Sequence, residues 1–262
     1  MVETNTVPDY EAMARNMAKR GWHFHKHADG PFDRFQVMGE RGCGTNILRK
    51  SINRSLEITR TEALGWKHGF PVMVGIPTDF LTICVVRNAK SWAQSLYKRP
   101  WHADPIVQQR PFAEFLRGEW IGQIDQSDHF ELVHRQLRPE GHELQWDRHP
   151  LTGQRFRNIF EMRNLKHRGL LSFLNRGTSV AFVQLEVFNA DPRGFLDALA
   201  EAYGLVWTEE GFVPVRRRMG NLWKAAVPRE DPPETWARAD LMFMRDQLEP
   251  QIERFMGYDA EA

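Results

Sequence analysis

This sequence has few cysteines, no long apolar run and almost no excess of charge of either sign. Each of these features excludes a class of protein. The 262 residues include only two cysteines, Cys43 and Cys84, which are too few for a disulfide framework. No apolar run approaches the length needed to cross a bilayer, and the polar residues 1–10 lack the apolar core of a signal peptide. These features predict a cytoplasmic protein without a membrane span.

The charges of the chain nearly cancel, with 35 Lys and Arg against 34 Asp and Glu and a formal net charge of +1. Proteins that bind nucleic acid through a broad basic face carry a large positive excess, so we expect no nucleic-acid partner. A content of 42% hydrophobic and 26% charged residues suits a folded α/β domain. We therefore interpret residues 1–262 as a single domain with a variable insert at about 100–157.

One glycine-rich stretch stands out, Gly39-Glu40-Arg41-Gly42-Cys43-Gly44-Thr45-Asn46. The apolar residues before it predict a strand, and Leu48, Ile52 and Leu56 after it recur every four positions, as on one helix face. A glycine turn that leads into a helix can cradle phosphate or sulfate, because backbone N–H groups and the helix dipole converge there. A turn that only permits tight packing is the alternative interpretation.

The order of strand, polar turn and helix recurs along the chain. Phe80–Val86 is a continuous apolar run that ends at Arg87, and a helix is expected over 89–98. Ser179–Gln184 is a third strand candidate, followed by a helix from Asp191-Pro192 to about Gly204. This alternation predicts an α/β fold with a three-layer, mainly parallel sheet flanked by helices, in which ligands bind at the carboxyl ends of the strands.

Three further helices are expected over 10–22, 158–176 and 233–256. The middle one carries a basic face, which we interpret as solvated, with substrate contact as the alternative; its members are Arg163, Lys166, His167 and Arg168. Five histidines are scattered through residues 100–153, namely His102, His129, His134, His142 and His149. Their spacing matches no compact ligand pattern, so no metal site is predicted.

Arg87 at a strand end and Ser95 on the following helix can face the same crevice as the glycine loop and bind a second anion there. Together these stretches resemble the sulfotransferases that use 3′-phosphoadenosine 5′-phosphosulfate (PAPS). The resemblance rests on the glycine loop, on Val85-Val86-Arg87-Asn88 with Trp92 and Ser95-Leu96-Tyr97, and on Arg216-Arg217-Arg218-Met219-Gly220-Asn221. In the family the glycine loop binds the 5′-phosphosulfate. The stretch with the equivalents of Arg87 and Ser95 binds the 3′-phosphate, and the C-terminal basic loop folds over the nucleotide.

The resemblance implies a P-loop NTPase-like sulfotransferase architecture, PAPS as donor, 3′,5′-adenosine bisphosphate as product, and no metal. The nucleotide-binding residues that it implies are Arg41, Gly42, Cys43, Gly44, Thr45, Asn46, Arg87, Ser95, Arg216, Arg217 and Arg218. The acceptor, a hydroxyl or amine on a small molecule, carbohydrate or lipid, would bind to the insert at 100–157. The aromatic side chains there, with Arg163, Lys166 and Arg168, suggest an acceptor that has apolar area and an anionic group.

Trp66-Lys67-His68-Gly69-Phe70-Pro71 is similar to a Lys-x-His-x-Pro segment of some family members, although Lys and His are adjacent here. We assign His68 as the general base, because an unperturbed pKa near ~6.5 suits proton removal at neutral pH, and Glu62 as the next candidate. Lys67 and Arg41 would stabilise the leaving group. Both Lys67 and His68 can reach the crevice only if Gly65 and Gly69 allow a turn.

Three positions depart from the family pattern. Cys43 stands where serine is usual, Arg41 lies one place further from Gly44 than the common lysine, and Gln184-Leu185-Glu186 replaces Arg-Tyr-Glu. A non-catalytic or kinase-like nucleotide-binding P-loop protein is the alternative function. The loop has the GxxxxG spacing of such proteins, but Thr45 occupies the place of their phosphate-binding lysine and no Mg-binding carboxylate appears at the expected spacing.

Overall fold

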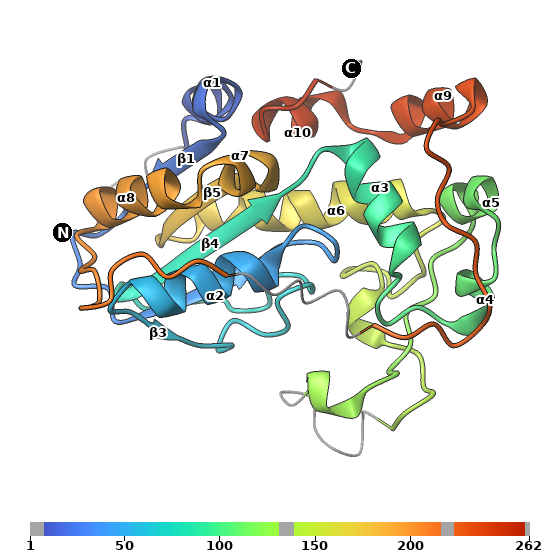
Figure 1. Cartoon of the computed structure of the whole chain (residues 1–262), viewed down its shortest axis with the longest axis horizontal. Helices are drawn as coiled ribbons and strands as arrows, with labels where there is room; N and C mark the ends of the chain where they lie inside the picture. Colours follow the sequence, from blue (N-terminus) through green and yellow to red (C-terminus); the bar gives the residue numbers. More distant parts are fainter. Residues whose placement is uncertain (1–7, 131–138, 216–222, 260–262) are drawn as a thin grey trace.

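The computed structural model describes residues 8–130, 139–215 and 223–259, and in these ranges the chain forms an α/β fold around a five-stranded sheet (Figure 1). The strands lie in the order β1 (Trp22–His25), β5 (Ser179–Gln184), β4 (Phe80–Val86), β2 (Arg34–Met38) and β3 (Thr59–Arg60). Neighbouring strands from β5 to β3 are parallel, and β1 is antiparallel to β5. The prediction of a mainly parallel sheet is confirmed.

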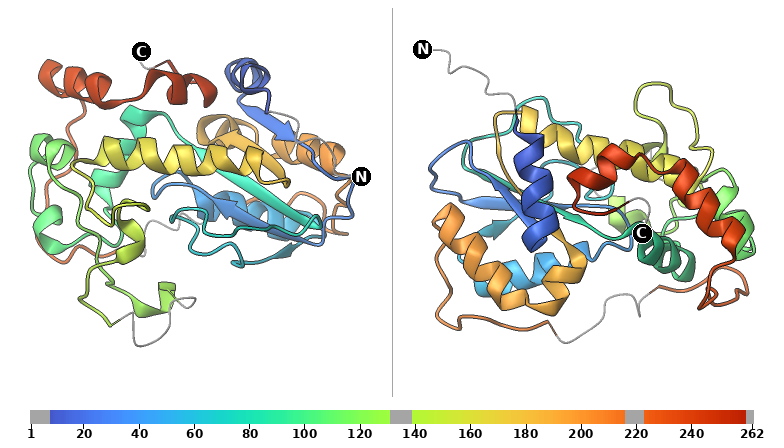
Figure 2. Two further views of the ribbon diagram at one scale, coloured as in Figure 1. Left: turned by 180° about the vertical axis from the view of Figure 1, so that it is seen from behind. Right: turned by 90° about the horizontal axis from the view of Figure 1, so that it is seen from above.

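Both faces of the sheet are covered, which explains the continuous apolar runs of the central strands. All seven residues of β4 are buried, and its six apolar residues divide between two hydrophobic clusters, one on each face of the sheet. One cluster includes residues of α2 (Thr45–Ser55) and α8 (Pro192–Tyr203), and the other includes residues of α1 (Tyr10–Arg20) and α10 (Pro250–Phe255). Figure 2 shows α2 and α8 on one side of the sheet and α6 (Ile159–Leu171) on the other.

Local capping signals determine where several helices begin. Asn88 caps α3 (Ala89–Lys98), Asn158 caps α6 and Asp191 caps α8, each by accepting a hydrogen bond from a backbone N–H of the first turn. The remaining helices are α4 (Pro105–Gln108), α5 (Phe112–Arg117), α7 (Leu185–Ala190) and α9 (Arg238–Gln247), with short 3₁₀ turns at Ser127–Phe130, Gln145–Asp147 and Ser172–Asn175.

The prediction of one closing helix over 233–256 is wrong. The chain forms two helices there, α9 and α10, separated by Leu248 and Glu249, both of which have extended backbone. Pro250 is the reason, because its ring disfavours helical geometry in the preceding residue and it has no N–H to continue the helical bonding. The predicted helix over 158–176 is also shorter than expected and ends in the 3₁₀ turn Ser172–Asn175.

The direction in which the chain crosses the sheet reverses at β2. From β2 the chain passes to β3 on one side and then to β4 on the other side. In parallel sheets such a reversal leaves a crevice at the carboxyl ends of the two strands, where ligands bind. The described residues of the insert, 100–130 and 139–157, extend beyond this end of the sheet (Figure 1).

The insert is packed in two ways. Some of its aromatic residues, including Phe115, Trp120 and Phe156, belong to the main core, while Phe130, Ile124 and Leu144 form a separate small cluster with Trp66. The insert therefore contacts the region around the carboxyl ends of the strands through Trp66. None of the described helices has the length and apolar composition that crossing a bilayer requires.

Candidate functional site

A cavity of about 940 Å³ lies at the carboxyl ends of β2 and β4. Its lining comes mainly from the glycine loop with the first turns of α2, the segment from Arg60 to His68, the end of β4 with α3, and the insert, and Leu185, Asn189 and Val215 add to it. The predicted site residues among its lining are Arg41, Gly42, Gly44, Thr45, Asn46, Lys67, His68, Arg87 and Ser95. Residues that are far apart in the sequence are thus brought together at the reversal of the sheet.

The glycine loop has the backbone geometry that an anion cradle needs. Gly42 and Gly44 have φ values of +82° and +80°, which favour glycine, and Gly44 is the N-cap of α2. Among the described residues, no hydrogen bond is formed by the N–H groups of Arg41, Gly42, Gly44, Thr45 and Asn46. These donors, together with the N-terminus of α2, are free to bind phosphate or sulfate oxygens.

Gly39 has a different role in the loop. A Cβ atom at this position would lie 2.4 Å from the backbone oxygen of Val85 on β4, so no other residue type fits without displacing the strand. The glycine therefore allows the loop to leave β2 while staying in contact with β4.

Cys43 is the one predicted loop residue that does not line the cavity. Its side chain is fully buried, and its N–H donates to the backbone oxygen of Glu40 at 3.1 Å. Burial raises the pKa of the thiol to about 12, so the sulfur is protonated and unreactive at neutral pH.

Arg87 and Ser95 both line the cavity beside the loop. Arg87 donates through Nη1 to the Gly42 backbone oxygen at 2.8 Å and through Nε to Ser91 Oγ at 3.1 Å. Both acceptors are neutral, so the guanidinium charge is available to a bound anion. Ser95 lies over the same turn, since a Cβ added at Gly42 would be 3.3 Å from its Oγ.

Lys67 and His68 both reach the cavity because the chain turns between two glycines. Gly65 has a φ of +96°, and the N–H of Gly69 donates to the Trp66 backbone oxygen at 2.8 Å. Lys67 Nζ donates to Asn46 Oδ1, in the first turn of α2, at 3.0 Å. A distant segment therefore places an ammonium at the N-terminus of α2.

The environments of these two side chains lower their pKa values. Burial, followed by the charge of Arg49, lowers the pKa of Lys67 to about 8. Burial and then the Lys67 charge hold the pKa of His68 well below its usual range. His68 Nδ1 lies 2.6 Å from the Gly39 backbone oxygen, so this nitrogen carries the ring proton and ties the segment to the loop.

Glu62, the second candidate for the base, also lines the cavity. Its Oε1 accepts hydrogen bonds from Arg49 and Arg60, both at 2.9 Å. Two guanidinium groups thus already occupy this carboxylate oxygen.

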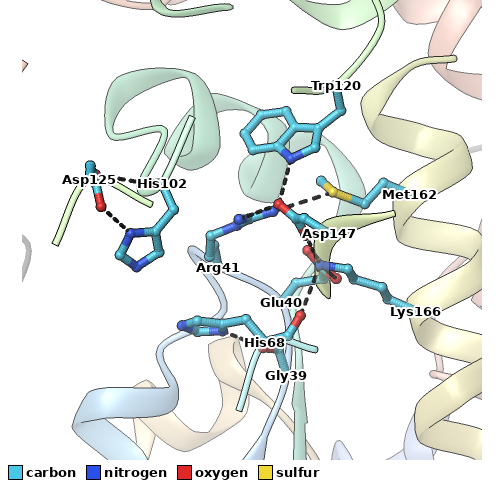
Figure 3. A network of polar contacts seen from close by, with 10 residues as sticks. All are labelled: Gly39, Glu40, Arg41, His68, His102, Trp120, Asp125, Asp147, Met162 and Lys166. Atoms are coloured by element: carbon cyan, nitrogen blue, oxygen red, sulfur yellow. Dashed lines mark hydrogen bonds and ion pairs between the residues drawn. The ribbon is translucent and has the colours of Figure 1, made fainter. Parts of the chain in front are cut away.

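Arg41 is held by residues of the insert and of α6 (Figure 3). Its side chain is 1% exposed, and its Nη1 forms an ion pair with Asp147 at 2.6 Å. Lys166 donates to the other oxygen of Asp147 at 2.5 Å and to the His68 backbone oxygen at 2.8 Å. Burial favours the neutral carboxyl, but the charges of Arg41 and Lys166 outweigh it and hold the pKa of Asp147 well below its usual range.

Glu40, next to Arg41 in the loop, is buried with its Oε1 3.6 Å from Lys166. Neither of its carboxylate oxygens accepts a hydrogen bond from a described residue. Burial raises the pKa of this carboxyl. The network at the loop therefore combines two cations, Arg41 and Lys166, with two carboxyl groups. The pKa of Asp147 is lowered, and that of Glu40 is raised.

The interpretation of the α6 basic face as solvated is wrong for Arg163, Lys166 and His167, which are all buried. Arg163 forms two hydrogen bonds of 2.8 Å with Glu253 and a third, of 2.9 Å, with the Arg87 backbone oxygen. The alternative of substrate contact also fails for these residues, because none of them lines the cavity. Arg168 is exposed and pairs with Glu249, so the basic face offers no acceptor site.

The aromatic residues Trp101, Phe130 and Trp146 of the insert line the cavity, where the sequence places an acceptor site, but sequence reasoning missed the histidines beside them. His102 and His129 both line the cavity, and their ring centroids are 5.2 Å apart. Their sequence spacing carries no signal, because it is the fold of the insert that brings them together. Arg216, Arg217 and Arg218 lie outside the described residues, but Val215, just before them, lines the cavity.

No protein-family model matches the chain, and comparisons with curated proteins and with solved structures find no match. The function is therefore inferred from the geometry of the cavity.

Proposed function

We propose that the protein is a sulfotransferase of P-loop-like architecture, which transfers a sulfuryl group from PAPS to a hydroxyl or amine acceptor by in-line displacement. The observation that supports this is the convergence, in one cavity, of unpaired loop N–H groups, Lys67 and the pair Arg87 and Ser95. These groups form two separate anion sites. PAPS carries anionic groups at its two ends, the 5′-phosphosulfate and the 3′-phosphate.

The 5′-phosphosulfate would bind to the loop and to the N-terminus of α2, where Lys67 adds a full positive charge. The 3′-phosphate would bind to Arg87 and Ser95, on the other side of Gly42. Arg216, Arg217 and Arg218 would contact the same nucleotide, a role that stays a prediction.

During transfer, negative charge builds on the oxygen that bridges sulfur and the 5′-phosphate. Lys67 would stabilise this charge directly, and Arg41, fixed by Asp147, would supply a preorganised positive field. Preorganised charges stabilise the transition state more than mobile ones, since they need not reorient during the reaction. His68, predicted as the base, and His102 are two imidazoles that line the same cavity.

Titration of tryptophan fluorescence tests the donor site, because Trp66, Trp101 and Trp146 line the cavity. We expect 3′,5′-adenosine bisphosphate to change the emission at low concentration and Mg-ATP to require a much higher one. Tighter binding of Mg-ATP would favour the kinase-like alternative.

Incubation with ³⁵S-labelled PAPS and phenolic, carbohydrate and lipid-alcohol acceptors tests the transfer itself. We expect label to appear in at least one acceptor. Nucleotide binding without transfer to any of them would favour a non-catalytic nucleotide-binding protein.

A further inference from the structure

His102 and Asp125, both from the insert, form a hydrogen-bonded pair at the cavity (Figure 3). His102 Nδ1 lies 2.5 Å from Asp125 Oδ1, and the His102 N–H also donates to the same carboxylate, at 3.3 Å. Burial favours the neutral carboxyl, but the hydrogen bonds from His102 outweigh it and lower the pKa of Asp125. The carboxylate therefore keeps the ring proton on Nδ1 and leaves the Nε2 lone pair as the basic site.

The backbone of His102 is unusual as well. It has a φ of +59°, the one positive φ of a non-glycine residue within the described ranges. Such a conformation is uncommon for histidine and persists only where the surroundings impose it. Here it accompanies a side chain that is 4% exposed and yet lines the cavity.

His68 is arranged differently, although it lines the same cavity. Its Nδ1 faces a neutral backbone carbonyl, that of Gly39, and after burial the Lys67 ammonium is what lowers its pKa most. A positive neighbour opposes formation of an imidazolium, whereas a carboxylate stabilises it. Of the two histidines, His102 is therefore the one whose ring is oriented by a carboxylate, and His68 is the one that ties its segment to the loop.

Aromatic rings surround His102 on the cavity side. The ring centroid of Phe130 lies 4.9 Å from that of His102, and that of Trp66 lies 5.9 Å away. Trp146 is 6.4 Å from both Trp66 and Phe130. These rings present flat apolar surfaces, against which a planar aromatic molecule can pack edge to face or stack.

Trp66 also connects this aromatic wall to the cations of the loop. The Arg41 guanidinium carbon lies 5.4 Å from the centre of the Trp66 ring, about as close as His102. A molecule held against Trp66 would thus lie near both the His102 ring and Arg41 of the anion-binding loop. In-line displacement requires this arrangement, with the base next to the acceptor oxygen and the cations next to the leaving group.

We propose that His102 is the general base of the reaction, positioned by Asp125, and that the acceptor is a hydroxyl group on an aromatic ring. This inference rests on the proposed sulfuryl transfer. The acceptor oxygen forms a bond to sulfur while the bond between sulfur and the 5′-phosphate oxygen breaks. The acceptor proton moves to His102 Nε2, and 3′,5′-adenosine bisphosphate leaves with the electron pair of the broken bond.

His102→Asn is the variant of choice, because asparagine tolerates a positive φ and can still donate to Asp125 but cannot accept the proton at neutral pH. Transfer of ³⁵S from PAPS would be measured with two phenols, 4-methylphenol and 4-nitrophenol. The first is about as weakly acidic as tyrosine, whose pKa is about 10, and needs a base, whereas the second is largely ionised at mildly alkaline pH and does not.

We expect His102→Asn to lose roughly 10²–10⁴-fold in turnover of 4-methylphenol and to lose little with 4-nitrophenol. Asp125→Asn should show a smaller loss with the same dependence on the phenol, which a merely structural defect would not produce. Both variants should bind 3′,5′-adenosine bisphosphate as the wild type does, which shows that they are folded. His142→Ala, an exposed position of the insert outside the cavity, is the matched control and should keep full activity with both phenols.

Equal losses with the two phenols, or no loss, would overturn the assignment of His102. Transfer by the wild type to carbohydrates or aliphatic alcohols but to neither phenol would overturn the inference and leave the proposed function standing. Failure of the wild type to bind 3′,5′-adenosine bisphosphate would overturn both.

Discussion

Two groups of basic side chains lie close together in this molecule and differ in the partners that they meet. Arg163 and Lys166 on α6 are buried against the carboxylates of Glu253 and Asp147. Lys67 and Arg87 at the cavity donate to an amide oxygen, a backbone oxygen and a hydroxyl, and within the described residues neither forms an ion pair. The first group has its charge neutralised inside the protein, whereas the second keeps its charge for a ligand.

A basic side chain is available to a ligand when the surrounding protein supplies it with neutral hydrogen-bond partners instead of a carboxylate. The sequence suggested a solvated or substrate-binding face on α6, but burial there requires that each charge be paired. At the cavity the neutral partners orient the cations without cancelling them. Arg41 is intermediate, since it lines the cavity but already pairs with Asp147.

The largest effect should come from breaking a pair of the buried group. Arg163→Leu leaves Glu253 buried without its counterion and should lower the free energy of unfolding by about 3–5 kcal/mol. The control on the same helix is Arg168→Ala, which removes an exposed ion pair and should change stability by about 0–1 kcal/mol. Urea denaturation followed by circular dichroism measures both.

A double variant sharpens this test. Arg163→Leu combined with Glu253→Leu removes both charges and should recover much of the lost stability. If the single variant were as stable as Arg168→Ala, Arg163 would belong with the available cations rather than with the buried group.

The next largest effect should come from Arg87 of the cavity group. Arg87→Ala removes a cation whose hydrogen-bond partners are neutral, and we expect the affinity for 3′,5′-adenosine bisphosphate to fall by about 2–3 kcal/mol in calorimetry. Lys98→Ala, at the end of the same helix that carries Ser95 and outside the cavity, should bind like the wild type. Unchanged affinity in the Arg87 variant would refute the role assigned to this residue.

Lys67 should make binding of the bisphosphate dependent on pH. Its pKa is lowered to about 8, so the free protein loses this charge as the pH rises through that value, and an anion binds better to the protonated form. Affinity should therefore be highest below about pH 8 and fall above it, with up to about one proton taken up per ligand at about pH 9.

Calorimetry in buffers of different ionisation enthalpy measures this proton uptake. Lys67→Met should bind more weakly below the pKa and show a flatter pH profile, because it has no ammonium to lose. Equal proton uptake by the variant and the wild type would assign the titration to another group.

The smallest effect is expected for Ser95, the neutral member of the predicted 3′-phosphate site. Ser95→Ala removes a single uncharged donor, so the affinity for 3′,5′-adenosine bisphosphate should fall by about 0.5–1.5 kcal/mol, less than for Arg87→Ala. A loss as large as that of Arg87→Ala would show that the serine also orients the loop, since it lies over Gly42.

The sequence by itself determined the central strands of the sheet, several helix starts and the position of the glycine loop. Apolar runs such as Phe80–Val86, caps such as Asn158 and Asp191, and the glycines of the loop act through neighbouring residues, so their consequences can be read locally. They place the loop and Arg87 at the ends of β2 and β4, and the parallel order of the strands predicts that they meet.

Only the tertiary structure decided which charges are paired and which residues the insert adds to the cavity. Asp147 lies 106 positions after Arg41, and Glu253 lies 90 positions after Arg163, so no local pattern links them. The same holds for His102 and Asp125, which the fold of the insert brings within 2.5 Å. Burial makes such pairing necessary for a buried charge, but the choice of partner depends on long-range packing, which periodicity and spacing do not encode.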